Sequence, residues 1–239
     1  RFGNIQLPEV VLVDLKEARK RKEINGFFSI KLIDAINEAL YNGEQVLLFQ
    51  NRRGYAPVLE CLTCGNVPQC TMCDVSLTYY KHQNHLKCHY CGYTMAMPNK
   101  CHACHSPDIS AKGLGTEQIE DALKLLFPNK KIARMDQDTT RGKFAFEKLF
   151  DSFKNGEIDI MVGTQMLAKG LDFDNVSLVG IMNADSMLSF PDFRSHERAF
   201  QLMLQVAGRA GRKTKQGKVL IQTYNPYHNT IQQVTRNDY

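Results

Sequence analysis

All eight cysteines of this 239-residue chain lie in one short segment, and all of them form Cys-x-x-Cys pairs. The four pairs are Cys61/Cys64, Cys70/Cys73, Cys88/Cys91 and Cys101/Cys104. One such turn places two thiolates on one side of a metal ion, and a second turn completes a tetrahedral zinc site. The four pairs therefore predict two Zn²⁺ ions. Because four protein sulfurs leave no position for water, we expect both ions to be structural.

The spacing of the pairs allows two groupings. Five residues separate the first two pairs, fourteen the middle two and nine the last two. The middle spacing is close to that of zinc ribbons. It favours a nested arrangement, in which one ion is bound by Cys70, Cys73, Cys88 and Cys91 and the other by Cys61, Cys64, Cys101 and Cys104. A sequential grouping is the main alternative, because its loops would also close.

Disulfide or redox chemistry is the other use that such pairs have. A secreted disulfide framework usually spreads its cysteines along the chain and follows a signal peptide, and the sequence shows neither feature. No βαβ pattern surrounds any single pair, as a thioredoxin-like site would require. Five histidines in the same segment could replace a thiolate: His82, His85, His89, His102 and His105. With eight cysteines available, we interpret them as surface or supporting groups.

A second pattern with chemical potential is QVAGRAGR at residues 205–212. Arg209 and Arg212 are three positions apart at the end of an amphipathic stretch, so their side chains project from neighbouring positions. Guanidinium groups match phosphate oxygens, and the glycines allow close approach. The pattern suits a triphosphate arriving from a neighbouring surface, whereas the alternative is an ordinary basic helix end.

A third pattern, MVGTQMLAKGLDF, spans residues 161–173 and follows an apolar run. Loops at the carboxyl ends of parallel strands are where α/β sheets bind ligands. The amides around Gly163–Gln165 and the Thr164 hydroxyl could hold a nucleic-acid phosphate. Asp172 could accept hydrogen bonds from a ribose.

The elements that must position these motifs alternate between strands and helices. Unbroken apolar runs, typical of parallel strands covered on both faces, occur at 10–13, 46–49, 132–135, 158–162, 176–182 and 219–222. Helical spacing occurs around 33–40, 119–126, 146–153 and 200–207, with Ser29 and Thr116 as expected N-caps. This alternation predicts an α/β domain with a mostly parallel sheet.

The cysteine segment interrupts that alternation. We expect residues 1–57 and 112–239 to form one discontinuous domain and residues 58–111 to form a zinc-binding insert. Hydrophobic residues make up 43% of the chain, enough for a core, and the net charge of +5 permits a nucleic-acid partner without requiring one. No run of roughly 18 apolar residues and no signal peptide occur, so we expect a cytoplasmic protein without membrane contact.

Taken together, these motifs resemble a known family. GTQMLAKGLDFDNV and QVAGRAGR resemble motifs V and VI of superfamily 2 helicases. With NRRGYAP (51–57), GLGTEQIED (113–121), MDQDTT (135–140), PDFRSHERAFQLML (191–204) and the four Cys-x-x-Cys pairs, the whole chain resembles the primosomal protein N′ (PriA) family of replication-restart helicases. The resemblance implies a RecA-like helicase C-terminal lobe with a small zinc-ribbon-like insert.

The resemblance also implies roles for particular residues. Arg212 would be an arginine finger on the γ-phosphate of ATP, with Arg209 assisting. Gly170 and Asp172 would border the nucleotide, whereas Thr164, Gln165, Arg52 and Arg53 would contact the DNA backbone. All eight cysteines would bind zinc in the nested arrangement. Implied partners are forked or single-stranded DNA, primosome proteins and single-strand-binding protein.

Two motifs of such helicases do not occur in the 239 residues: the GxxxxGK[ST] phosphate loop and the acidic motif that holds Mg²⁺. We therefore expect a fragment that supplies half of an ATP site and is inactive alone. A non-enzymatic zinc-ribbon adaptor for protein or nucleic acid is the alternative function, but it would not need motifs V and VI. An RNA helicase lobe would share both motifs but not the eight-cysteine insert.

Overall fold

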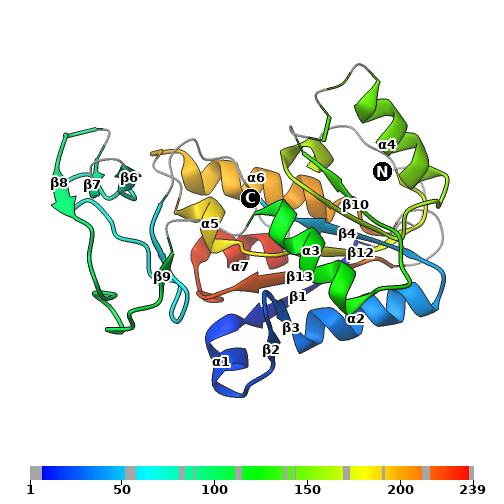
Figure 1. Cartoon of the computed structure of the whole chain (residues 1–239), viewed down its shortest axis with the longest axis horizontal. Helices are drawn as coiled ribbons and strands as arrows, with labels where there is room; N and C mark the ends of the chain where they lie inside the picture. The colour runs from blue at the N-terminus through cyan, green and yellow to red at the C-terminus, as the bar shows by residue number, and fades with distance from the viewer. Residues whose placement is uncertain are drawn as a thin grey trace.

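Six parallel strands form the central sheet of the computed structural model (Figure 1). Their order is β1 (Glu9–Asp14), β13 (Lys218–Thr223), β12 (Val176–Ile181), β4 (Gln45–Phe49), β11 (Ile160–Gly163) and β10 (Ile132–Met135). The structure describes residues 7–51, 58–80, 84–88, 90–110, 115–136, 139–140, 142, 144–168, 173–189, 192–211 and 216–236.

Each apolar run expected to be a strand overlaps one strand of this sheet. The central strand β4 is buried along its whole length, and β11 is as well. A strand covered by helices on both faces needs apolar side chains at every position, which is why these runs do not alternate with polar residues. The predicted parallel α/β architecture is confirmed.

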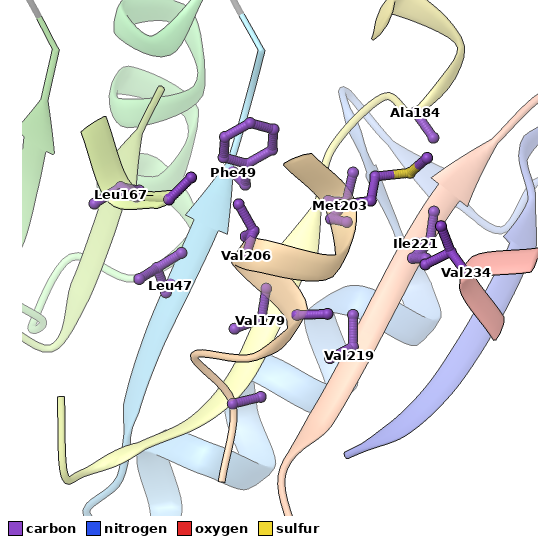
Figure 2. Close-up of a cluster of buried hydrophobic side chains, with 14 of the residues drawn as sticks. Leu47, Phe49, Leu167, Val179, Ala184, Met203, Val206, Val219, Ile221 and Val234 are labelled. Atoms are coloured by element: carbon purple, nitrogen blue, oxygen red, sulfur yellow. The ribbon is translucent and has the colours of Figure 1, made fainter. Parts of the chain in front are cut away.

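Helices cover both faces of the sheet. On one face, α2 (Ile30–Tyr41) and α3 (Thr116–Leu126) pack on alternate strand residues such as Val46 and Leu48. On the other face, α4 (Ala145–Lys154), α6 (Ser195–Ala207) and α7 (Asn229–Arg236) pack on Leu47 and Phe49 and their neighbours. Figure 2 shows Val206 of α6 beside Leu47, Phe49 and Val179 on this second face, and Met203 of the same helix near Ala184 and Ile221. Successive strand residues point to opposite faces, so each strand contributes to both cores.

Four stretches with helical spacing are helices, but one of the two expected caps is wrong. Ser29 caps α2, since its Oγ accepts a hydrogen bond from the Leu32 amide at 3.2 Å. Thr116 is instead the first residue of α3, and Gly115 is the N-cap. The Thr116 hydroxyl donates to Asp136 Oδ2 at 2.6 Å, so a tertiary contact has taken the place of a local cap.

Short helices were not expected from the sequence. They are α1 (Leu15–Lys20), the 3₁₀ helix η1 (Gln165–Ala168) and α5 (Asp185–Leu188). Helices of one or two turns carry too few apolar positions to show a period, and their caps and tertiary packing determine them instead. Among the described residues, no helix combines the length and the apolar character needed to cross a bilayer.

The cysteine segment leaves the main domain after β4 and returns before α3. Its stem is the antiparallel pair β5 (Glu60–Cys61) and β9 (Ile109–Ser110). Its outer part is a small antiparallel sheet of β6 (Thr78–Tyr80), β7 (His85–Lys87) and β8 (Thr94–Ala96). Figure 1 shows this sheet at the end of the molecule, beyond the stem and α5. The remaining hairpin, β2 (Ile24–Asn25) with β3 (Phe28–Ser29), precedes α2.

Candidate metal centres and phosphate-binding edge

The four Cys-x-x-Cys pairs adopt the same turn. In each, the amide of the first cysteine donates a hydrogen bond to the carbonyl oxygen five residues later: Cys61 to Asn66, Cys70 to Val75, Cys88 to Tyr93 and Cys101 to Ser106. The residue after each second cysteine has a positive φ: Gly65, Asp74, Gly92 and His105. This left-handed residue reverses the chain and directs both sulfurs to one side, so each pair is a preformed half of a metal site.

The turns meet two by two in the nested arrangement. One cluster contains Cys61, Cys64, Cys101 and Cys104, and the other contains Cys70, Cys73, Cys88 and Cys91. Within each cluster all sulfurs lie within 4.8 Å of one another. The Sγ atoms of Cys61 and Cys104 are 3.5 Å apart, and those of Cys64 and Cys101 are 3.6 Å apart. Four sulfurs about 2.3 Å from a tetrahedral zinc ion would be separated by about 3.8 Å, so both clusters fit zinc.

The ionisation of the thiols also favours a cation. Burial, followed by neighbouring sulfurs, raises the pKa of Cys64 to about 12. Hydrogen bonding to Cys91 and burial raise the pKa of Cys73 to about 12. Burial opposes the ionisation of Cys88, but the amides of Cys91 and Tyr90 outweigh it and lower its pKa to about 7. Four thiolates cannot coexist in such a cluster without a positive ion, whereas a dication would stabilise all four.

Histidines stay outside both clusters in the part of the chain that the structure describes. His85 stacks on Tyr80 with ring centroids 5.4 Å apart, and His102 and His105 are exposed. His82 and His89 lie outside the described residues. The exposed positions of His102 and His105 agree with their interpretation as surface or supporting groups, and His85 is half-buried.

At the carboxyl edge of the main sheet, the structure brings together the two motifs of residues 161–173 and 205–212. The Arg209 guanidinium donates from Nη2 to the main-chain carbonyl of Ala168 at 2.7 Å. Ala168 ends η1, which follows β11, and Arg209 follows α6. Arg209 is partly buried, so this contact fixes its position beside the loop of residues 161–173. Arg212, Gly170, Asp172, Arg52 and Arg53 lie outside the described residues, as does the rest of that loop at 169–172.

Thr164 and Gln165 begin the turn after β11. The Thr164 amide donates to the carbonyl of Met135 at 3.3 Å, which ties the turn to the neighbouring strand β10. Gln165 Nε2 donates to Asn51 Oδ1 at 3.1 Å, so the ends of β11 and β4 are also joined. A groove of 490 Å³ runs between this pair and the Gln201–Gln205 face of α6. Gln165 therefore lies where a ligand could reach the sheet edge.

A polar network at the end of β10 was missed by the sequence reasoning. The buried Asp136 accepts hydrogen bonds from the Thr116 hydroxyl and from the Thr139 amide at 3.1 Å, and it lies 3.3 Å from Arg134. The Thr140 hydroxyl donates to the carbonyl of Asp136 at 2.6 Å. The network joins the start of α3 to this loop. In the sequence, these residues fall within the stretches GLGTEQIED and MDQDTT. Both stretches contributed to the family resemblance, but no function was predicted for their residues.

Comparison with known proteins gives two family matches. The model of the helicase conserved C-terminal domain matches residues 108–214, and the model of the PriA DNA helicase Cys-rich region domain matches residues 70–95. With the six-stranded parallel sheet and the two Cys₄ clusters, these matches define the class: a RecA-like helicase C-terminal lobe that carries a zinc ribbon. The fold predicted from the sequence is confirmed.

Curated relatives identify the family more narrowly. The replication restart protein PriA of Bacillus subtilis (strain 168) is 48% identical over 239 residues, covering 100% of this chain and 30% of the relative. The same protein of Haemophilus influenzae is 45% identical, covering 100% of this chain and 32% of the relative. The chain belongs to the PriA family of replication restart proteins. It spans about a third of the length of these relatives.

Solved structures show a weaker likeness. S. cerevisiae Dbp5 bound to RNA and ADP BeF3 superposes on 98% of this chain with a TM-score of 0.47 and 14% identity, covering 40% of the Dbp5 chain.

Proposed function

We propose that the chain is the second motor lobe and zinc-binding region of an ATP-dependent DNA helicase that restarts stalled replication forks. The observation that carries this proposal is the contact of Arg209 with Ala168, because it places an arginine of motif VI against the motif V loop. An adaptor that only docks partners would need neither motif nor their contact. A helicase that acts on replication forks works where the DNA is, which agrees with the cytoplasmic location expected from the sequence.

In this proposal the lobe contributes positive charge to an ATP site whose other half lies outside the 239 residues. Arg212 stabilises charge on the γ-phosphate in the transition state, and Arg209 assists from its position beside η1. Gly170 and Asp172 border the nucleotide. The phosphate loop and the acidic residues for Mg²⁺ come from another part of the protein. The chain alone therefore neither hydrolyses ATP nor unwinds DNA.

The same edge of the sheet holds the DNA backbone. Thr164 offers its hydroxyl, and Gln165 offers its side-chain amide and its main-chain N–H, at the carboxyl end of β11; such neutral donors commonly position nucleic-acid phosphates. Arg52 and Arg53, which follow β4 in sequence, add positive charge. The substrate is forked or single-stranded DNA, and primosome proteins and single-strand-binding protein are the expected protein partners.

The eight cysteines bind two zinc ions whose role is structural. Each cluster supplies four sulfurs and leaves no position for a reacting water. The pairing of β5 with β9 closes the segment at residues 60–61 and 109–110, which supports boundaries near 58 and 111 for the insert. The metals hold together a region whose own apolar core is small: Leu59, Val75, Leu77, Leu86 and two cysteines.

The proposal is tested by measuring DNA-stimulated ATP hydrolysis and fork unwinding with the full-length protein and with the 239-residue chain. We expect both activities in the full-length protein and neither in the chain alone. DNA-stimulated ATPase activity from the chain alone would contradict the division of the site. A full-length protein that binds forks but has no ATPase activity would favour the adaptor.

A further inference from the structure

The stem of the cysteine segment is hydrogen-bonded directly to the main domain. Glu60 in β5 accepts a hydrogen bond at Oε1 from Asn183 Nδ2 at 3.0 Å. Asn183 follows β12 and is 8% exposed, and its own Oδ1 accepts from the Ser186 amide at the start of α5. A buried side chain held at both ends allows little movement of the stem relative to the sheet.

The first zinc turn also packs on the main domain, through Gly65 and Tyr224. A Cβ atom built on Gly65 would lie 2.4 Å from Tyr224 Cγ, so the Gly65 backbone lies flat against the ring. Tyr224 follows β13, and its amide donates to Asp185 Oδ2 at 2.7 Å. Its hydroxyl donates to the carbonyl of Leu62 at 3.5 Å. Gly65 needs its left-handed φ of +72° to complete the turn around Cys61 and Cys64.

The second zinc cluster is held differently. Its turns have the same internal hydrogen bonds as those of the first cluster, from Cys70 to Val75 and from Cys88 to Tyr93, so the difference lies in what surrounds them. A cleft of 590 Å³ lies between the insert and the main domain: Gly65 and Tyr224 line its inner end, where they touch, whereas Gln69 and Tyr93 line it across from His196 and Asn225. The two clusters therefore differ in their surroundings: the first lies on the main sheet's carboxyl edge and the second lies across a cleft from it.

We propose that the first zinc centre is the anchor of the insert, and that Gly65 and Tyr224 are its positioning residues. Zinc bound by Cys61, Cys64, Cys101 and Cys104 fixes the turn that packs on Tyr224, and the packed Tyr224 in turn slows release of that zinc. The second zinc centre stabilises only the outer part of the segment. This inference rests on the proposed binding of two zinc ions.

The test is pulse alkylation of the full-length protein in the presence of a zinc chelator, with each cysteine followed by mass spectrometry. Tyr224→Ala leaves the cysteine segment unchanged in sequence. We expect it to accelerate alkylation of the first cluster by roughly 10-fold, within the range typical of coupled sites, and to leave the second cluster at the wild-type rate. The inference would be overturned if Tyr224→Ala left the alkylation rates of both clusters at their wild-type values, or if it accelerated alkylation of both clusters equally. Tyr224→Phe keeps the ring that packs on Gly65 and removes only the 3.5 Å hydrogen bond to Leu62, so it should lie closer to wild type than Tyr224→Ala does.

A matched pair of glycine variants tests the same contact from the other side. Gly92 has a φ of +78° at the equivalent position of a second-cluster turn, but a Cβ there meets no atom within 4 Å. Gly65→Ala and Gly92→Ala therefore carry similar backbone strain, and only the first collides with the main domain. We expect Gly65→Ala alone to increase hydrogen exchange at residues 176–189 and 218–225. Increases of the same size in both variants would contradict the proposal.

Metal analysis separates this inference from the proposed function. A wild-type protein with fewer than two zinc ions would refute the proposed zinc binding itself. Two zinc ions per chain with no selective effect of Tyr224→Ala would refute the anchor alone.

Discussion

Arg209 donates a hydrogen bond from Nη2 to the carbonyl oxygen of Ala168 at 2.7 Å, across 41 positions of sequence. This contact joins the end of α6 to the loop after β11, so any shift of one motif moves the other. A guanidinium held by a main-chain carbonyl keeps a defined direction, and that is what transition-state stabilisation requires of an arginine.

Gly163 ends β11 immediately before the turn that presents Thr164 and Gln165. A Cβ atom there would lie 2.6 Å from Leu167 Cδ1 and 2.7 Å from the carbonyl oxygen of Met135. We expect Gly163→Ala to lower the free energy of unfolding by roughly 1–3 kcal/mol, because the neighbouring backbone has to move. Since η1 would shift with it, DNA affinity of the full-length protein should fall as well, measured by fluorescence anisotropy.

The matched control for that variant is Gly142→Ala, where a new Cβ would make an ordinary 3.4 Å contact with Ala145. Its stability and DNA affinity should stay near wild type. If Gly163→Ala behaved in the same way, the close packing around η1 would be refuted.

Glu60 predicts a dependence of stability on pH. Burial raises its pKa to about 7 from 4.5, against the Asn183 hydrogen bond, and Asp185 adds to the rise. Between these pH values the folded protein holds more protons than the unfolded chain, so stability falls as pH rises from 4.5 to about 7 and then levels off. Glu60→Gln keeps an acceptor for Asn183 and removes the charge. At pH 8 it should raise the free energy of unfolding by about 3 kcal/mol at most.

Urea unfolding at pH 5 and pH 8 measures this effect, with the exposed Glu157→Gln as control. The gain in the Glu60 variant should be present at pH 8 and small at pH 5. A gain of equal size at both pH values would show that the Glu60 carboxyl is not the cause.

Gln222 is fully buried in β13 and connects three segments. Its Oε1 accepts from the Ser29 amide at 2.7 Å, and its Nε2 donates to the carbonyls of Phe27 and Met182, both at 3.0 Å. Gln222→Met has similar volume but leaves these groups unpaired. We expect a loss of roughly 2–4 kcal/mol in unfolding free energy. The control is Gln201→Met on the exposed face of α6, which should change the unfolding free energy little. Equal losses of stability in the two variants, measured by thermal unfolding, would contradict the prediction.

The nested arrangement predicts which cysteines share an ion. Cys104→Ser should reduce bound zinc from two ions to one and accelerate alkylation of Cys61, Cys64 and Cys101 while the other four cysteines stay protected. Cys91→Ser should do the reverse. Serine is a much weaker zinc ligand than thiolate, so each variant disables one site. Exposure of Cys88, Cys91 and Cys101 in the Cys104 variant, with Cys61 and Cys64 still protected, would instead indicate a sequential grouping.

Much of the main fold could be predicted because its strands are buried on both faces. Val46–Phe49 and Ile158–Val162 show this as continuous apolar runs, and the amphipathic helices around them show a 3.6-residue period. The zinc ligands could be predicted because Cys-x-x-Cys spacing is itself the geometry of a half-site. The nested grouping rested on spacing and resemblance, and the sulfur positions agree with it.

Other features depend on tertiary contacts that leave no local trace. Thr116 looks like an N-cap, but its hydroxyl is used by Asp136, twenty positions away. Asn183 and Tyr224 follow strands and resemble ordinary loop residues, although they hold the cysteine segment. Gly65 is part of a zinc turn in the sequence, and only the packed ring of Tyr224 shows why a larger residue would not fit there.

The central claim, that this lobe supplies arginines to a shared ATP site, is tested most directly by ATP hydrolysis in the full-length protein carrying Arg212→Ala. We predict a loss of roughly 10³-fold or more in DNA-stimulated hydrolysis with ATP binding nearly unchanged, because an arginine finger acts mainly in the transition state. The exposed Arg236→Ala on α7 is the matched control and should hydrolyse ATP at the wild-type rate. Wild-type hydrolysis in the Arg212 variant would contradict the claim.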